Sequence, residues 1–282
     1  MYTFKAENEY GDILELTHSP DYTVTGIEGL DPPKASINTS VVASFDGSRF
    51  NSSRMGERNI VVTVVIEREI EENRIRLYRY FKPKKKVRLY YKNGSRDVFI
   101  DGYVEDFQIS PFDQRQRAQI SVICPEPFFQ AMEEMMISFS TLSKEFYFPF
   151  AIGAEGVPFS IMETNPTKVM TNNGDVESGL VILLQTTGEV RNPRIYNVDT
   201  NEFFGLDITM QAGDLVTINT NKGRKSVSLR REGSTENIIN SIRRGSSWFQ
   251  IASGENTFTY EADNAVENLV CTFRYTDKFE GV

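Results

Sequence analysis

Residues 59–67 read NIVVTVVIE, and residues 68–81 read REIEENRIRLYRYF. The first run is apolar and β-branched with almost no interruption, which predicts a strand covered on both faces. In the second run, large side chains recur at helical spacing, and acids precede bases as the helix dipole favours. These side chains are Ile70, Arg74, Leu77 and Phe81, with Tyr78 beside them. The stretch therefore predicts a buried strand followed by an amphipathic helix.

Three short strands are expected after this helix, which Pro83 should end. Asn93-Gly94, a pair typical of hairpin turns, lies between the apolar runs KKKVRLYY and RDVFIDGYVEDFQI. A further turn at residues 110–115 leads into AQISVIC, and CPEPFF follows from Cys124. Residues 58–129 thus predict one unit in the order strand, helix and three-stranded meander.

The residues before this unit predict a hairpin that cannot bury its own surface. TFKAE and DILELT are expected to be short strands, and Pro32-Pro33 breaks the chain after them. Residues 35–58 then give two β-compatible segments around an Asp-Gly turn, with few large apolar side chains. Such a hairpin is marginal alone. Residues 39–53 therefore either form a surface hairpin on their own domain or reach a neighbouring chain.

The second half of the chain differs from the first in amino-acid composition. Residues 130–150 are Met-rich and fit either a helical turn or a strand, so we place a domain boundary there. Beyond them, short alternating runs separated by Gly, Asn and Asp turns predict an antiparallel sandwich. We expect two mainly β domains, residues 1–140 with one helix and residues 141–282, and the last strand is free to return to the first domain.

Composition excludes several functional classes. The chain has 282 residues, a net charge of −8 and a pI near 5.0, which argues against nucleic-acid binding through clustered Lys and Arg. The N-terminus lacks the pattern of a signal peptide, and no run is long enough to span a membrane. Cys124 and Cys271 are expected to be buried free thiols.

No constellation of reactive side chains predicts an enzyme. The single histidine, His18, is expected in a loop, and with two distant cysteines it cannot give a zinc pattern. The acids from Glu67 to Glu72 could form a glycosidase pair, but their place at a helix start favours a solvated helix end. We therefore expect no catalytic residues, no metal and no cofactor.

Two clusters could bind partners. Lys84, Lys85 and Lys86 follow the predicted helix and fit either a solvated turn or a contact with an acidic neighbour. Trp248, with Arg243 and Arg244 nearby, fits either core packing or a platform that stacks a sugar.

In their order along the chain, several of these pieces resemble the distal tail protein family of siphophages. The most specific piece is CPEPFF after an alternating strand, and weaker matches are Gly26-Ile27, Gly29-Leu30, Gly102, Asn192-Pro193 and Gly213-Asp214. The resemblance implies an N-terminal β-sandwich domain with a hairpin arm and a C-terminal galectin-like β-sandwich. The chain lacks the large insertion that carries an extra carbohydrate-binding module in some relatives.

The resemblance also implies a structural function. It implies a homo-hexameric ring at the virion tail tip, assembled in the bacterial cytoplasm, with DNA passing through its channel. The implied partners are the tail tube protein, the tail-associated fibre or lysin protein and a receptor-binding protein, with no membrane contact. Expected subunit contacts are Thr39, Val41, Phe45, Asp46, Arg49, Phe50 and Ser53 in the hairpin, Arg74 and Tyr78 on the helix, and Lys84, Lys85 and Lys86. The alternative is an adhesin that binds cell-wall carbohydrate through Trp248, Arg243 and Arg244.

Overall fold

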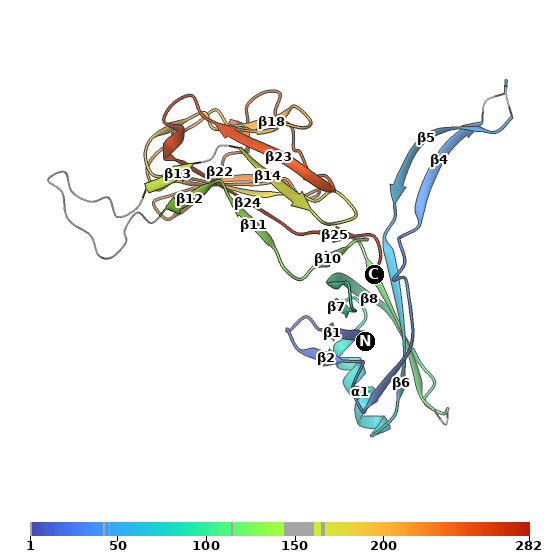
Figure 1. Cartoon of the computed structure of the whole chain (residues 1–282). Helices are drawn as coiled ribbons and strands as arrows, with labels where there is room; N and C mark the ends of the chain where they lie inside the picture. Colours follow the sequence, from blue (N-terminus) through green and yellow to red (C-terminus); the bar gives the residue numbers. More distant parts are fainter. Residues whose placement is uncertain (1, 42, 45, 114, 144–160, 165–166) are drawn as a thin grey trace, which may run out of the picture. The chain divides into compact units, whose positions relative to one another are not determined.

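The chain folds into two compact units in the computed structural model (Figure 1). The structure describes residues 2–41, 43–44, 46–113, 115–143, 161–164 and 167–282. The first unit consists of Met1–Met132 and Lys278–Val282, and the second of Glu133–Asp277. The boundary between the units therefore lies before residue 140, where the change in composition placed it. The final segment of the chain, Lys278–Val282, is part of the first unit.

The first unit is built on one sheet whose main path runs β2-β1-β7-β8-β9-β6-β3, with β10 pairing β8 and β25. Its strands are β1 (Thr3–Glu7), β2 (Ile13–Glu15), β3 (Tyr22–Glu28), β6 (Arg58–Ile66), β7 (Lys86–Lys92), β8 (Asp97–Ile109), β9 (Arg117–Cys124), β10 (Phe129–Ala131) and β25 (Lys278–Phe279). The predicted hairpin at Asn93-Gly94 joins β7 to β8, so the predicted meander is confirmed.

The opening run forms β6, which lies between β9 and β3. Ile60, Val62 and Val64 are buried, whereas Asn59 is exposed and Val61 and Thr63 are only partly buried. The prediction of a strand covered on both faces therefore holds only at the end of β6, where Val65 and Ile66 are both buried, and is wrong for the rest. The outward positions also carry β-branched side chains, and these hide the period-two alternation of a half-exposed strand.

The predicted helix is α1 (Ile70–Tyr80), and it covers the inner face of the sheet. Leu77 and Phe81 are fully buried in the core formed with β6 and its neighbours. The hydroxyl of Tyr22 on β3 donates a hydrogen bond to the Asn73 carbonyl at 3.1 Å, which joins the helix to the edge of the sheet. The amphipathic pattern thus predicted the helix because its apolar stripe is the face that packs.

The hairpin that leaves this sheet consists of β4 (Ala35–Val41) and β5 (Ser48–Met55). It lies between β3 and β6 in the chain and pairs with no other strand among the described residues (Figure 1). We call residues 35–55 the arm. Residues 29–34 lead into it, and Gly56 and Glu57 connect it back to β6.

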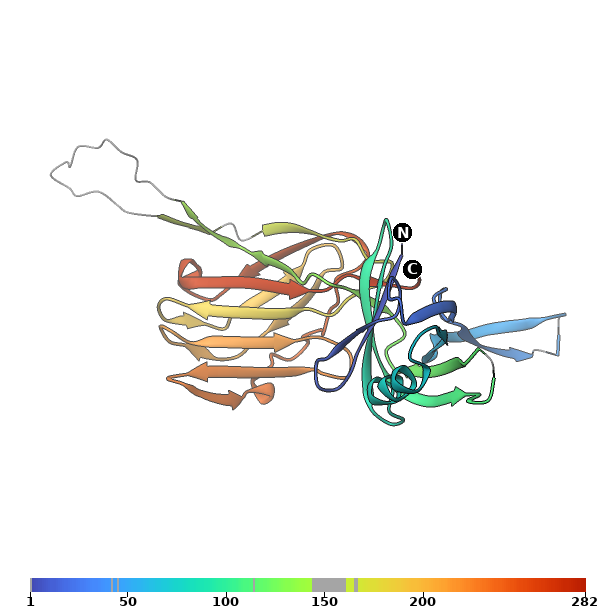
Figure 2. The same ribbon diagram turned by 90° about the horizontal axis from the view of Figure 1, so that it is seen from below.

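The second unit is a sandwich. One sheet has the order β11-β24-β15-β20-β21-β22, and Figure 2 shows strands of the second unit running side by side. The other has the order β14-β23-β17-β18. The rings of Phe258 and Phe273, one from each sheet, meet edge to face at 5.1 Å between centroids. The predicted mainly β fold with one α-helix in the described residues is confirmed.

The Met-rich segment forms a strand, β11, which pairs with β24. The strands of the second unit are β11 (Met135–Ser138), β12 (Ser140–Ser143), β13 (Ile161–Thr164), β14 (Thr167–Asn172), β15 (Val181–Thr186), β16 (Val190–Arg191), β17 (Arg194–Asn197), β18 (Glu202–Gly205), β19 (Thr209–Met210), β20 (Leu215–Asn219), β21 (Ser226–Arg231), β22 (Ser234–Asn237), β23 (Gly254–Glu261) and β24 (Leu269–Tyr275). Two short 3₁₀ turns lie at Ile239–Ser241 and Val266–Asn268.

Cys124 and Cys271 are buried free thiols, as predicted.

Candidate inter-subunit surfaces

The arm is the most exposed part of the described chain. Every described residue from Ala35 to Met55 is exposed, and Val41 and Phe50 keep 86% and 60% of their surface accessible. Of the candidate contacts, Thr39, Val41, Arg49, Phe50 and Ser53 lie on its strands and Asp46 lies in its turn, while Phe45 lies outside the described residues.

The two faces of the arm differ in chemistry. A bulge on β5 shifts the register, because Asn38 pairs with Ser52 whereas Thr39 pairs with Phe50. Residues directly opposite one another project to the same face of a hairpin. One face therefore carries the large apolar side chains, and the other carries both arginines with serines and asparagine. The apolar face holds Ile37, Thr39, Val41, Phe50 and Met55, and the arginine face holds Ser36, Asn38, Ser40, Arg49, Ser52 and Arg54.

An apolar hairpin face in water is unfavourable, since burial stabilises by about 25 cal/mol for each Å² of apolar surface. The arm consequently gains free energy when another surface covers it.

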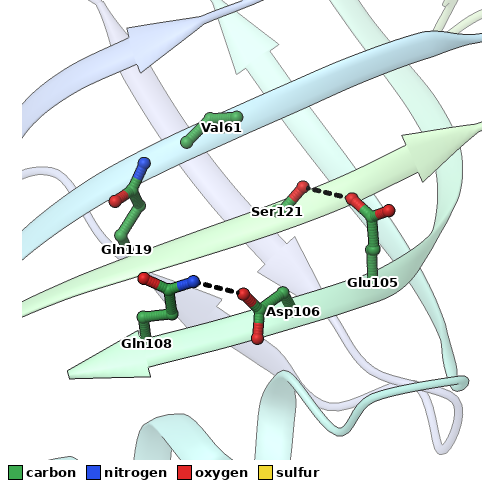
Figure 3. A pocket seen from close by; sticks show the side chains of 6 residues that line it. All are labelled: Val61, Glu105, Asp106, Gln108, Gln119 and Ser121. Atoms are coloured by element: carbon green, nitrogen blue, oxygen red, sulfur yellow. Dashed lines mark hydrogen bonds between the residues drawn. The ribbon is translucent and has the colours of Figure 1, made fainter.

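The outer face of the first unit's sheet carries a hollow of about 370 Å³ with a mostly polar lining (Figure 3). Val61, Glu105, Asp106, Gln108, Gln119 and Ser121 line it. Ser121 donates a hydrogen bond to Glu105 at 2.9 Å, and Gln108 donates one to Asp106 at 2.6 Å. Neither carboxylate has an ion-pair partner in the described part of the chain.

A bulge places these two carboxylates together. The pairing of β8 with β9 shifts between Val104 and Asp106, so Glu105 is an extra residue. Both acids are exposed on the outer face. Sequence reasoning missed this pair, although the polar doublet Glu105-Asp106 interrupts an otherwise alternating strand and could have indicated the bulge.

The basic turn after the helix is partly paired with acids of the first unit. Lys85 pairs with Glu9 at 3.0 Å, and Lys86 and Arg88 pair with Asp101 at 3.0 and 2.7 Å. Burial raises the pKa of Asp101, but the hydrogen bonds and charges of Arg88 and Lys86 outweigh it and hold that pKa below its ordinary value. Lys84 has a positive φ, and its amide donates to the Val104 carbonyl.

The two helix candidates, Arg74 and Tyr78, lie one turn apart on the same side of α1. Arg74 forms an ion pair with Glu71, and its side chain is only 19% exposed. Tyr78 is 40% exposed, and its ring lies edge to face with Phe107 on β8, with 5.0 Å between centroids. Tyr78 is thus available to a partner on one side only.

The three sugar-site candidates do not form one platform. Trp248 contacts the buried Phe204 edge to face at 4.9 Å, whereas Arg243 packs over Gly205 and pairs with Asp207 at 2.6 Å. Successive strand residues point to opposite faces, so Trp248 and Arg243 lie against opposite sides of β18. Arg244 is exposed.

The single histidine makes a contact within the first unit. His18 is exposed in a loop, with Nε2 at 3.0 Å from the Tyr2 carbonyl. In the described ranges, no three His, Cys, Asp or Glu side chains gather closely enough to hold a metal ion. No helix in that part of the chain is long and apolar enough to cross a membrane.

Residue Arg58 was not singled out as a site in its own right, yet it joins distant segments of the first unit. It is 3% exposed, and its guanidinium donates to the carbonyls of Gly29, Asp31, Pro127 and Glu280. The group also lies over the Phe129 ring, 4.6 Å from its centroid. Burial lowers the pKa of Arg58 from its very high ordinary value. We call this arrangement the Arg58 clasp.

Sequence comparison identifies both halves of the chain. Residues 11–124 match the family model described as phage tail protein RIFT-related domain, and residues 173–279 match the siphovirus-type tail component, C-terminal domain. The chain belongs to the distal tail protein family of siphophages. A comparison with curated proteins found no match.

Solved structures of distal tail and baseplate proteins share this fold. The crystal structure of the phage SPP1 Dit protein, described as a hub adsorption apparatus of phages that infect Gram-positive bacteria, aligns with a TM-score of 0.68 at 13% identity, over 98% of this chain and 99% of that one. A chain of the phage P2 baseplate with calcium aligns with a TM-score of 0.53 at 12% identity, over all of both chains. The strontium form of that baseplate gives 0.50 at 10% identity, again over all of both chains. This distal tail protein is therefore a structural relative of phage tail hub components.

Proposed function

We propose that this distal tail protein is a non-enzymatic hub subunit of a siphophage tail tip. Six copies form a ring that joins the tail tube protein to the tail-associated fibre or lysin protein, and DNA passes through the channel. The second unit offers an attachment surface to a receptor-binding protein. Assembly takes place in the bacterial cytoplasm, before the tail is complete.

The exposed arm supports self-association more than any other feature. Its apolar face has no cover within the described chain, and a head-to-tail contact repeated through a closing rotation produces a ring. The apolar side chains Val41 and Phe50 supply the driving force. The arm therefore reaches a second copy of the chain.

The mostly polar hollow on the outer face of the sheet suits the wall of a passage for DNA. Glu105 and Asp106 project from it without ion-pair partners in the described chain, and carboxylates repel the phosphates of duplex DNA. The net charge of −8 acts in the same direction. A wall that does not bind phosphates lets the genome move without being retained.

The test of ring formation compares the intact chain with a variant that lacks residues 39–53. Native mass spectrometry and negative-stain imaging should show a closed ring for the intact chain and no ring for the variant. Circular dichroism checks that the variant is folded. Unchanged assembly without the arm segment would contradict the proposed contact, and an intact chain that stays monomeric at high concentration would contradict self-assembly.

The test of the passage wall uses the double substitution Glu105→Lys and Asp106→Lys. This variant should retain duplex DNA at physiological salt, whereas the intact chain should not. Glu72→Lys on the exposed face of α1 is the matched control, and it should leave DNA binding unchanged. Tight DNA binding by the intact chain would overturn this part of the proposal.

The adhesin alternative remains a separate hypothesis that the Trp248→Ala variant tests. Loss of cell-wall binding in this variant, with the fold intact, would favour it. The packing of Trp248 against Phe204 supports a structural role for this ring.

A further inference from the structure

The Arg58 clasp lies at the root of the arm. Two of its acceptors, the carbonyls of Gly29 and Asp31, are in the segment that leads from β3 into the arm. Arg58 itself follows the returning strand β5 after only Gly56 and Glu57. One side chain therefore holds both chain segments that connect the arm to the sheet.

The same side chain holds the segment that returns from the second unit. Its Nη2 donates to the carbonyl of Glu280, and the amide of Val282 donates to the Leu30 carbonyl at 3.2 Å. Leu30 also belongs to the outgoing root of the arm. The terminal segment thus contacts the arm root directly as well as through Arg58.

The contacts at the arm root leave little room for adjustment. Gly29 has a φ of +85°, and a Cβ atom there would lie 2.1 Å from the Asn59 carbonyl oxygen. A Cβ atom on Gly281 would lie 3.0 Å from Pro32 and 3.2 Å from the Leu30 carbonyl oxygen. The root and the terminal segment are packed backbone against backbone, which makes their arrangement stiff.

Both connections to the second unit start from the strands beside this root. β25 begins at Lys278, immediately after Asp277, and β10 ends at Ala131, shortly before Glu133. The two strands pair with each other, with Phe129 opposite Phe279, and the Phe129 ring lies under the Arg58 guanidinium. In the chain, the second unit is therefore joined to the first through β10 and β25.

We propose that the Arg58 clasp is a conformational coupling device that fixes the direction of the arm while β25 is in place and releases it when β25 moves. A partner that binds or pulls on the second unit would thereby change how the arm leaves the first unit. Coupling of this kind is reciprocal, so an arm held by a partner would also stabilise β25 in its place. This inference goes beyond ring formation, since it concerns the single chain.

The decisive measurement is the distance between the arm and the helix in dilute chains, where no second copy is bound. Spin labels on Ser53→Cys in the arm and Glu72→Cys on α1 report this distance by pulsed electron paramagnetic resonance. Cys124 and Cys271 are buried and remain unlabelled. The labelled chain should give one narrow distance distribution.

Breaking the clasp should broaden that distribution. Arg58→Met keeps a long side chain but donates no hydrogen bonds. Phe279→Ala weakens the packing of β25 in the core of the first unit and leaves Arg58 unchanged. Both should broaden the distribution at least about twofold. Arg117→Met, an exposed arginine on the same sheet, is the matched control and should leave it narrow. A distribution equally narrow in all three variants would overturn the proposal, as would a broad one in the otherwise unaltered labelled chain.

Hydrogen exchange of the unaltered chain covers the case in which these variants do not fold. The Val282 amide, which donates to the Leu30 carbonyl of the arm root, and the hydrogen-bonded amides between β25 and β10 should open together, with the same rate and the same dependence on denaturant. Opening of β25 while the Val282 amide stays protected at the arm root would contradict the coupling. Both measurements use unassembled chains, so failure of ring formation and failure of the clasp give different results.

Discussion

At the residue scale, Arg58 places a charge in the protein interior, and the hydrogen bonds of its guanidinium go to backbone carbonyls. Desolvation of a guanidinium is unfavourable, and four carbonyl dipoles together with the Phe129 ring offset it. Hydrogen bonds to a charged donor contribute about 1.5–3 kcal/mol each. Lysine cannot replace this residue, because an ammonium group does not present a planar fork of donors.

Asp214 gives the second unit an acid-sensitive contact. Its carboxylate accepts hydrogen bonds from Arg231 at 2.9 and 2.5 Å and from the Gln211 amide at 2.8 Å. The Arg231 hydrogen bond, with help from the Gln211 amide, holds the pKa of Asp214 below its ordinary value although burial opposes this shift. Asp214 is nearly inaccessible to solvent, so water replaces these bonds poorly.

We predict that Asp214→Asn destabilises the second unit by about 2 kcal/mol at neutral pH. A carboxyl group whose pKa is lowered by folding contributes its full stabilisation above the unfolded value of about 3.9, and the contribution disappears as the pH falls through the folded value. Urea unfolding should therefore show a large difference between the two chains at pH 7. The difference should shrink below about pH 3.9; a constant difference across this range would contradict the assignment.

We also predict that neither cysteine reacts with a thiol reagent in the folded chain. Burial raises the pKa of Cys124 to about 12 and raises that of Cys271 well above its ordinary value, so the reactive thiolate is scarce at neutral pH. Reaction with Ellman's reagent should be absent under native conditions and complete in denaturant. Reaction of one thiol before unfolding would indicate local opening around that strand.

At the scale of elements, the local sequence pattern was enough to predict an element wherever its own residues decide its conformation and packing. The spacing of Leu77 and Phe81 predicted α1, and Asn93-Gly94 predicted the β7–β8 hairpin. The partly exposed face of β6 was missed because its side chains, such as Val61 and Thr63, are β-branched like those of the buried face. The Met-rich segment was ambiguous because its strand conformation depends on β24, more than a hundred residues later in the chain.

The surfaces proposed for partners were only partly predictable. The arm was recognisable because residues 35–58 have few large apolar side chains, so the hairpin cannot bury much of its own surface. Its division into an apolar and an arginine face depends on a bulge that no residue in the hairpin indicates by itself. The carboxylate pair at Glu105 and the clasp at Arg58 depend on pairing with distant strands, and Glu280 lies 222 residues from Arg58.

We predict that the arm is protected from hydrogen exchange only after assembly. In the dilute chain, an uncovered two-stranded hairpin opens easily, so the amides of β4 and β5 should exchange much faster than those of β6. In assembled rings, their exchange should slow by about tenfold or more if contact with a neighbouring copy stabilises the closed hairpin by at least about 1.4 kcal/mol. Equal protection in both states would mean that the arm already has a cover in the single chain.

At the scale of the whole molecule, the first unit is not one continuous stretch of chain, because it contains residues from both ends. Phe279 belongs to the core of the first unit, and Phe273, six positions earlier, is in the core of the second. The two units have separate cores, and we expect separate unfolding transitions.

We predict that Phe279→Ala and Phe273→Ala affect different transitions. Removal of a buried phenylalanine costs about 3–5 kcal/mol when the cavity does not collapse, and Phe279, at the rim with 7% exposure, should lie toward the lower end. Scanning calorimetry should show that Phe279→Ala lowers the transition of the first unit and Phe273→Ala that of the second. A common shift of both transitions would show that the units unfold as one.

The return of β25 to the first unit also determines when that unit can be completed during synthesis. The ribosome delivers residues 1–132 first, but Phe279 and the Glu280 carbonyl emerge only after all of Glu133–Asp277. A nascent first unit therefore lacks one strand and one acceptor of the Arg58 clasp until translation has passed the second. An unfinished polypeptide thus carries an arm whose root is not yet secured, and only a chain translated through β25 presents that arm in its final direction.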